Sequence, residues 1–252
     1  MIYIGLPVRN ERHTIGPLLW RIRELLYGER REFHVIVCDD ASDDGTGDSL
    51  AKYTRVLPMT LLHNATSEGY AASLERLVRE AVARSGYPKR DALVTMQADF
   101  SDPPECVPEL LRRFEGGGDL VTVAPVAPSS NSRRIVRWGA GLFARSVRAP
   151  ESDHDPYASL RLYRLFMLGR ALDDLDDDSA LLTQQGWAAN AELLLRVWPY
   201  TRRGETIEPI TVSDRRYRGS RFRALQQLRA LLRAERDPRV RKAVERLRET
   251  AA

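Results

Sequence analysis

Two acidic groups stand directly after apolar runs, where a folded chain could bring them to one site. Asp39 and Asp40 end the run FHVIVCDD, and Asp99 and Asp102 lie in the segment QADFSD after DALVTM. Carboxylates placed in this way can bind a divalent cation, accept hydrogen bonds from a ligand, or cap a helix. Capping explains the polar residues 42–44 at least as well as ligand binding does.

The other residues that could bind or transform a ligand are basic. Arginines gather in SRRIVRWGAG, in LRLYR and in DRRYRGSRF, and an arginine fork suits phosphate oxygens. Arginine is abundant throughout the chain, so each one could also be an ordinary surface residue. The four histidines show no metal-ligand spacing, and the two cysteines form neither a thiolate metal site nor a disulfide framework. We therefore expect a reducing, cytoplasmic setting.

The elements that must position these residues alternate between strand and helix in the first half. Apolar runs predict strands within 1–8, 33–40, 56–64, 91–99 and 119–126, and periodic patterns predict helices within 14–26, 48–53, 70–86 and 103–117. This alternation favours an α/β fold with a doubly wound, mostly parallel sheet. Ligands of such sheets bind beyond the carboxyl ends of the strands, so both acidic groups would face one site.

The second half is less regular. The segment 150–164 is predicted to be polar connecting chain, 173–178 a solvated acidic loop, 186–198 a helix, and 207–222 a short strand followed by a basic loop. From residue 222 onward the pattern predicts basic helices. We expect a catalytic domain over 1–220 and a basic helical tail over 221–252.

Composition limits the function classes. The chain has 252 residues, of which 43% are hydrophobic and 29% charged, as in a soluble globular protein. No apolar run approaches the roughly 18 residues of a membrane span. The net charge of +4 resides in the tail rather than on a binding face, which argues against nucleic acid as a partner. The tail is either a solvated helix or a peripheral contact with an anionic membrane surface at the cytoplasmic face. Neither GxGxxG nor a P-loop follows a predicted strand, so the site would more readily use a divalent metal to neutralise a diphosphate.

Several segments together resemble one enzyme family. IGLPVRNE, VIVCDDASDDGT and VTMQADFSDPPE resemble, in order and spacing, the landmarks of inverting family 2 glycosyltransferases. The similarity is greatest to the dolichyl- or polyprenyl-phosphate mannosyl- and glucosyltransferases, whose third segment usually reads D-A-D-L-Q-x-P-P-E. SRRIVRWGAGLFAR resembles their basic acceptor segment, and DPYASLRLYR resembles D-P-x-S-G-F-R. AELLLR and DRRYRGSRF resemble the closing motifs, so the likeness spans residues 2–222.

The resemblance implies a GT-A fold and transfer of a sugar from a GDP- or UDP-linked donor to a polyprenyl or dolichyl phosphate. The residues it assigns to the nucleotide sugar are Pro7, Arg9, Glu11, Asp39, Asp40, Gln97, Ala98 and Asp99. Those it assigns to the phosphate of the acceptor are Arg133, Arg134, Arg137, Arg215 and Arg216. Those it assigns to catalysis are Asp99, Arg137, Arg161 and Asp155. A divalent cation, Mg²⁺ or Mn²⁺, would be held by Asp99 and Asp102.

The chain departs from the family pattern at several positions. Gln97 replaces the first aspartate of D-x-D, and Ser101 replaces the glutamine that usually follows. Arg9 replaces a tyrosine, and Ala158-Ser159 replaces Ser-Gly. Fewer carboxylates should weaken a site for a hard cation.

These departures leave alternatives open. A soluble small molecule of a specialised-metabolite pathway could be the acceptor, and a hydroxyl acceptor would need a general base, for which Asp155 and Glu192 are candidates. A degenerate nucleotide-sugar binding module and a nucleotidyltransferase are the other two interpretations, the latter lacking its glycine-rich phosphate loop.

Overall fold

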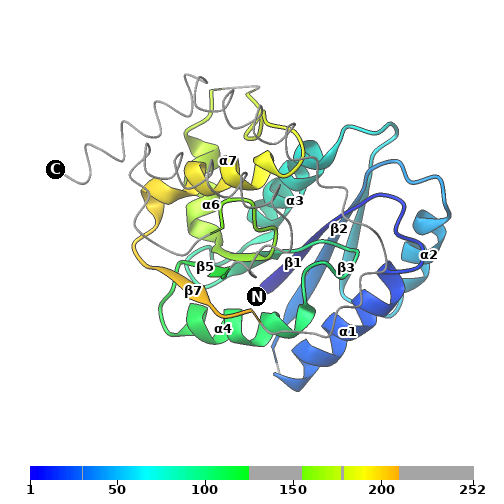
Figure 1. The fold of residues 1–252 in the computed structure, drawn as a ribbon, viewed down its shortest axis with the longest axis horizontal. Coiled ribbons are helices and arrows are strands. Elements are labelled where there is room, and N and C mark those ends of the chain that lie inside the picture. The colour runs from blue at the N-terminus through cyan, green and yellow to red at the C-terminus, as the bar shows by residue number, and fades with distance from the viewer. Residues whose placement is uncertain (30, 125–154, 177–178, 210–252) are drawn as a thin grey trace, which may run out of the picture.

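A single sheet forms the centre of the part of the chain that the computed structural model describes, residues 1–29, 31–124, 155–176 and 179–209 (Figure 1). Its order is β3-β2-β1-β4-β6-β5-β7. The strands are β1 (Ile2–Val8), β2 (Phe33–Asp39), β3 (Met59–His63), β4 (Ala92–Thr95), β5 (Leu120–Val123), β6 (Arg161–Arg164) and β7 (Gly204–Ile207). Only β6 runs antiparallel to its neighbours, so the prediction of a mostly parallel α/β sheet is confirmed.

Helices cover both faces of the sheet (Figure 1). They are α1 (Ile15–Gly28), α2 (Thr46–Tyr53), α3 (Tyr70–Arg84), α4 (Val107–Glu115), α6 (Leu165–Asp173) and α7 (Ala188–Val197), with the 3₁₀ turns η1 (Pro104–Cys106) and η2 (Trp198–Tyr200). One apolar core includes buried residues of α1, α2 and α4, and a second includes those of α3, α6 and α7. No helix of the described residues combines the length and the hydropathy that crossing a bilayer requires.

The strand β1 shows how the sequence builds these two cores. Ile4 and Leu6 belong to the first core and Tyr3 to the second, because successive side chains of a strand point to opposite faces. Gly5 lies on the face that α3 covers, where an added Cβ would come within 3.2 Å of Leu93 Cδ1. The missing side chain therefore mainly leaves room for Leu93 of the neighbouring strand β4, since the nearest atom of α3, Leu77 Cβ, would lie at an ordinary contact distance of 3.7 Å.

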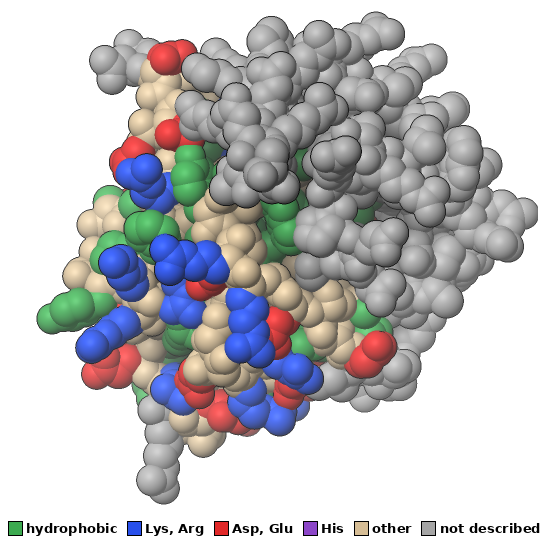
Figure 2. All heavy atoms as spheres, turned by 90° about the vertical axis from the view of Figure 1, so that its left-hand side faces the viewer, with side chains coloured by type: hydrophobic (Ala, Val, Ile, Leu, Met, Phe, Trp, Pro, Cys, Tyr) green, Lys and Arg blue, Asp and Glu red, His purple; other side chains and the backbone are tan. Residues whose placement is uncertain are grey.

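The one charged side chain of β7, the last strand in the order of the described sheet, pairs with two arginines. Glu205 lies 2.8 Å from Arg203 and 3.6 Å from Arg113 of α4. On the face that Figure 2 shows, basic and acidic side chains are interspersed rather than separated.

The second half of the chain differs most from expectation. The expected connector 150–164 contains the inner strand β6, and α6 follows it directly, although the sequence pattern predicted neither. The strand is only four residues long and has an arginine at each end, so it carries almost no apolar signal. The last described strand, β7, precedes the predicted 207–222 segment and shares only residue 207 with it. The tail 221–252 and the domain boundary at 220 lie outside the described residues.

Candidate functional site

The candidate site lies at the carboxyl ends of β1, β2 and β4, next to the point where the strand order reverses between β1 and β4. Three residues in the left-handed backbone region follow these strands: Asn10 (φ 56°), Ala41 (φ 53°) and Phe100 (φ 60°). This conformation is unfavourable for alanine and phenylalanine and persists only where the surroundings impose it. The clustering of the three at one edge indicates loops held in specific shapes.

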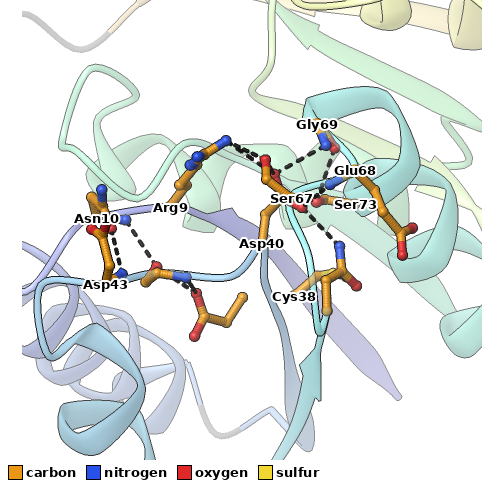
Figure 3. A network of polar contacts seen from close by, with 12 residues as sticks. Arg9, Asn10, Cys38, Asp40, Asp43, Ser67, Glu68, Gly69 and Ser73 are labelled. Atoms are coloured by element: carbon orange, nitrogen blue, oxygen red, sulfur yellow. Dashed lines mark hydrogen bonds and ion pairs between the residues drawn. The ribbon is translucent and has the colours of Figure 1, made fainter.

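Asp40 is the centre of a hydrogen-bond network at this edge (Figure 3). Its Oδ1 accepts bonds from Asn64 Nδ2 at 2.9 Å and from the backbone N–H of Glu68 at 2.7 Å. Its Oδ2 accepts bonds from Ser67 Oγ at 2.8 Å and from the N–H of Gly69 at 3.0 Å. Four donors use the ordinary acceptor capacity of a carboxylate. Asp40 therefore holds the loop between β3 and α3 in place.

These bonds change the acidity of Asp40. Burial by itself raises the pKa of the carboxyl group, but the hydrogen bonds from Asn64, Glu68, Ser67 and Gly69 outweigh it and leave the pKa below its ordinary value.

Gly69 has φ +93°, and a Cβ there would come within 2.9 Å of Gln185 Oε1. The loop that Asp40 binds thus also approaches the segment before α7.

The neighbouring Asp39 is fully buried and has different partners. Its Oδ1 accepts bonds from Ser42, at 3.2 Å from the backbone N–H and also from the hydroxyl at 2.5 Å. Its Oδ2 has no hydrogen-bond partner among the described residues and lies 3.4 Å from Nδ1 of His63, whose ring is largely exposed. Asp39 therefore retains unused acceptor capacity, whereas Asp40 does not.

The residues expected to line the nucleoside pocket surround this network. Arg9 is about half-exposed, donates from Nη1 to Ser67 Oγ, and lies 3.8 Å from Asp40 Oδ2. Pro7 lies in β1 opposite Cys38 of β2. Glu11 accepts a 2.7 Å bond from Thr14 Oγ1 at the start of α1. The structure thus brings together these three residues and both aspartates at one edge of the sheet.

The carboxylates after β4 form the second part of the site. Asp102 Oδ2 accepts bonds from the backbone N–H of Gln97 at 2.8 Å and from Ser159 Oγ at 2.6 Å. Asp99 Oδ1 accepts a 2.9 Å bond from the N–H of Ser101. Burial raises the pKa of Asp102 to about 6, and the negative charge of Asp99 adds to this, against the lowering effect of the two hydrogen bonds. Ala98, between Gln97 and Asp99, is buried and contributes packing.

This pair of carboxylates suits a hard cation. The described residues contain no group of three His, Cys, Asp or Glu side chains arranged to hold a metal. Magnesium, however, is commonly bound by one or two carboxylates together with phosphate oxygens of the substrate and water. Neither Asp99 Oδ2 nor Asp102 Oδ1 accepts a hydrogen bond from another described residue. The donor set therefore fits a cation that a diphosphate would share.

Arg161 and Asp155 lie on the other side of this edge. Arg161 is fully buried in β6, and its guanidinium donates to the backbone carbonyls of Asp155 at 2.6 Å and Asn190 at 2.8 Å, and to Tyr163 Oη at 3.3 Å. Its Nε has no partner among the described residues. Asp155 Oδ1 caps the turn by accepting from the N–H of Tyr157 at 2.9 Å. Arg161 thus anchors the segment 155–159, which carries Ser159.

Glu192 of α7 is buried and holds a loop. Its Oε2 accepts from the N–H groups of Thr183 and Gln184, each at 2.8 Å, and its Oε1 accepts from Thr183 Oγ1 at 3.0 Å. Arg196 lies 3.5 Å from Oε1. These contacts make Glu192 a positioning residue for the segment before α7 and occupy the carboxylate that a general base would need.

The polar side chains of Tyr70, Ser159 and Asn190, to which the sequence analysis assigned no role, connect these parts of the site. Asn190 accepts from Tyr70 Oη at 2.8 Å and donates to the carbonyl of Tyr157 at 3.3 Å, and Ser159 binds Asp102. The signal for Asn190 was present, since it is a polar residue amid the apolar run of α7. The expected acceptor residues Arg133, Arg134, Arg137, Arg215 and Arg216 lie outside the described residues.

Comparisons with known proteins agree on one family. The family described as Glycosyl transferase family 2 matches residues 3–171. Among curated proteins, the undecaprenyl-phosphate mannosyltransferase of Micrococcus luteus is 33% identical over 175 residues, which cover 67% of this chain and 68% of that protein.

Two further curated relatives match shorter shares. The dolichol-phosphate mannosyltransferase of Pyrococcus furiosus is 30% identical over 47% of this chain and 31% of its own length. An undecaprenyl-phosphate 4-deoxy-4-formamido-L-arabinose transferase of Pseudomonas fluorescens is 28% identical over 65% of this chain and 46% of its own length. The match thus leaves more than half of each of these two relatives unaligned.

Solved structures share the fold. Glucosyl-3-phosphoglycerate synthase of Mycobacterium tuberculosis in complex with UDP gives a TM-score of 0.62 at 19% identity, over 94% of this chain and 81% of that one. S. aureus TarS 1–349 gives a TM-score of 0.56 at 15% identity, over 82% of this chain and 57% of that one. The architecture is that of the GT-A glycosyltransferases.

Proposed function

Because the chain belongs to glycosyl transferase family 2, we propose that this glycosyltransferase moves a sugar from a nucleoside diphosphate sugar to a polyprenyl phosphate. The observation that carries the proposal is the convergence of three motif segments at one edge of the sheet. The segment around Arg9, the Asp39-Asp40 pair and the Gln97–Asp102 loop all follow strands that lie side by side, β1, β2 and β4. The names of the curated relatives supply the acceptor class.

The donor would occupy the edge above β1 and β2. Pro7, Arg9 and Glu11 would border the nucleoside, with Asp39 and Asp40 beside it. Of these two carboxylates only Asp39 has an oxygen, Oδ2, without a hydrogen-bond partner among the described residues, since Asp40 is fully engaged by the 64–69 loop. Asp40 would then contribute by shaping the pocket. Uracil and guanine both present a ring N–H, so the assay described below is needed to identify the base of the donor.

The diphosphate would lie beside the Gln97–Asp102 loop. A divalent cation, held there by Asp99 with Asp102 beside it, would stabilise negative charge on the departing nucleoside diphosphate. Arg137 and the neighbouring arginines are expected to bind the phosphate of the acceptor. These arginines stay a prediction from the resemblance.

The transfer itself places few demands on acid–base chemistry. An oxygen of the acceptor phosphate forms a bond to the anomeric carbon while the bond from that carbon to the diphosphate breaks, and the electron pair leaves with the nucleoside diphosphate. Because a phosphate monoester is already anionic near neutral pH, the acceptor needs no general base. This agrees with Glu192 being bound to its loop, and it leaves Asp155 as a base only for a hydroxyl acceptor.

The test is transfer from radiolabelled UDP- and GDP-sugars to undecaprenyl phosphate in detergent, with Mn²⁺ or Mg²⁺. Lipid-linked product from one donor supports the proposal and identifies the base. Transfer to a soluble phosphorylated acceptor such as phosphoglyceric acid, with none to the lipid, would instead establish the soluble-acceptor alternative, which a structural neighbour bound to that acid favours. Nucleotide binding without any transfer would indicate a degenerate binding module.

We further propose that the full chain contacts a membrane surface at the cytoplasmic face through the tail 221–252. The basic composition of that segment supports the proposal. Cosedimentation with anionic phosphatidylglycerol vesicles, but not with neutral phosphatidylcholine vesicles, is the expected outcome. Equal binding to both would refute an electrostatic contact.

A further inference from the structure

Two residues that depart from the family pattern meet at a third residue, Asp102, in the structure. Gln97 stands where D-x-D has its first aspartate, and Ser159 stands where D-P-x-S-G-F-R has its glycine. Asp102 stands at the unspecified position of D-A-D-L-Q-x-P-P-E. The backbone N–H of Gln97 and the hydroxyl of Ser159 both donate to Asp102 Oδ2, at 2.8 Å and 2.6 Å. Residues 102 and 159 are far apart in the sequence, so only the fold brings Ser159 to Asp102.

The contacts orient the Asp102 carboxylate. Two donors on Oδ2 fix the carboxylate plane and leave Oδ1 without a hydrogen bond from any other described residue. Ser159 is itself held, because it is buried and its carbonyl accepts a 2.7 Å bond from Thr95 Oγ1 of β4. A glycine at position 159 would have no side-chain donor, and Asp102 would lose this restraint. The hydroxyl of Ser159 therefore acts as an outer partner that directs a carboxylate.

The number of negative charges in the 97–102 loop explains why glutamine at position 97 is compatible with aspartate at position 102. An aspartate at position 97, together with Asp99 and Asp102, would place three carboxylates within six residues, where like charges repel. Glutamine at position 97 removes one of them and leaves a pair. The loop thus keeps two carboxylates, as D-x-D does, but one of them comes from position 102.

We infer that Asp102, oriented by Ser159, replaces the carboxylate that Gln97 lacks, so that Asp99 and Asp102 together hold the divalent cation of the donor site. The inference rests on the proposed function and deepens it, because it identifies which residues set the affinity for the cation. The cation site is then reorganised rather than degraded.

The experiment measures Mn²⁺ binding, not turnover. Mn²⁺ affinity in the presence of UDP or GDP is determined by electron paramagnetic resonance for the full-length wild type and for Asp102→Asn, Ser159→Gly and Asp99→Asn. We expect Asp99→Asn and Asp102→Asn each to weaken binding at least about tenfold, and Ser159→Gly to weaken it about tenfold. The double variant Ser159→Gly/Asp102→Asn should be no weaker than Asp102→Asn, since the serine acts only through the carboxylate.

A matched control separates this effect from stability. Ser85 Oγ donates to Asp91 Oδ2 at 2.6 Å, the same hydroxyl-to-carboxylate contact at the opposite edge of the sheet. Ser85→Ala should leave Mn²⁺ affinity unchanged, and near-ultraviolet circular dichroism verifies that each variant is folded. A loss of Mn²⁺ affinity in Ser85→Ala equal to that of Ser159→Gly would overturn the inference.

The outcomes distinguish the inference from the proposed function. If Asp99→Asn abolishes Mn²⁺ binding while Asp102→Asn and Ser159→Gly bind it like wild type, the inference fails and the metal-assisted transfer stands. If the wild type binds no Mn²⁺ with either nucleotide, both fail. As an independent check, Gln97→Asp combined with Asp102→Ser should bind Mn²⁺ within about threefold of wild type, because the charge returns to the position of the family motif. Mn²⁺ binding as weak as that of Asp102→Asn would contradict the inference that Asp102 replaces the carboxylate missing at position 97.

Discussion

Asn64 and Asp40, at the ends of the neighbouring parallel strands β3 and β2, are joined by a 2.9 Å hydrogen bond from Asn64 Nδ2 to Asp40 Oδ1. The amide orientation is defined by its other end, because Asn64 Oδ1 accepts from Arg76 Nη1 of α3. Asp40 is thus part of a relay that runs from a helix through an asparagine to a loop at the candidate site. The relay explains why a carboxylate at a strand end is buried rather than presented to a ligand.

Replacing Asp40 with asparagine should destabilise the fold. In Asp40→Asn, one acceptor oxygen becomes an NH₂ group that faces donors such as Ser67 and the N–H of Gly69. An unsatisfied buried donor costs about 1–3 kcal/mol, so the free energy of unfolding should fall by about this amount. Urea denaturation measures it. Asp43→Asn, at an exposed position of the next loop, is the control and should change the value by less than about 0.5 kcal/mol. Equal effects in the two variants would contradict the network.

The same carboxylate predicts a loss of stability in acid. The pKa of Asp40 is lower in the folded chain than the unfolded value of about 3.9. Its stabilising contribution is therefore complete above the unfolded pKa and is lost as the pH falls through the folded pKa. Urea midpoints of the wild type should decline below about pH 4, and those of Asp40→Asn should decline less. Parallel curves for the two proteins would show that Asp40 has no depressed pKa.

Removing the Asp99 carboxylate should abolish transfer and leave the fold intact. Asp99 is partly exposed, and its carboxylate accepts a 2.9 Å hydrogen bond from the N–H of Ser101. Asp99→Ala should lower kcat by at least about a hundredfold, as expected for lost charge stabilisation. The free energy of unfolding should change by less than about 1 kcal/mol. Ser101→Ala, whose side chain is exposed, serves as control, and near-normal transfer by Asp99→Ala would refute a metal-centred mechanism.

Glu192→Gln separates a positioning role from a general base. The neutral isostere keeps acceptor capacity for the N–H groups of Thr183 and Gln184 but loses the charge facing Arg196. We expect a loss of stability of about 1–3 kcal/mol and less than about a tenfold loss of kcat, with an unchanged pH profile. A general base would instead lose about a hundredfold or more, together with the acidic limb of the profile. Rates measured between pH 5.5 and 8.5, with the phosphate acceptor and with a hydroxyl acceptor, decide between the two roles, because only the hydroxyl acceptor would need a base.

Arg161→Lys should loosen the segment 155–159. A lysine has no planar fork, so it cannot bind the carbonyls of Asp155 and Asn190 with the same geometry. The free energy of unfolding should fall by about 1–3 kcal/mol, and hydrogen exchange of the amides of 155–160 should accelerate. Arg170→Lys, at an exposed position on α6, is the control. Unchanged exchange in Arg161→Lys would show that the segment is anchored by other contacts.

Part of the fold was readable from the sequence. The strands β1 to β5 and the helices α1 to α4 carry strong periodic patterns, because each buries one face against a core. The strand β6 carries none, since its central position comes from pairing with β4 and β5 and two of its four residues are arginines. Burial of Arg161 depends on carbonyls from two distant segments, which a local pattern does not reveal.

The sequence by itself determined the family, the strand-end carboxylates and the departures at Gln97 and Ser159, because these follow from residue types and their order. The tertiary structure decided which acidic group does what. Asp40 is saturated by a loop from the next strand, and Asp102 is oriented by a serine from β6's preceding turn. Hydrogen bonds between residues distant in the sequence are short-ranged and directional, so whether they form depends on strand pairing and helix packing rather than on local composition.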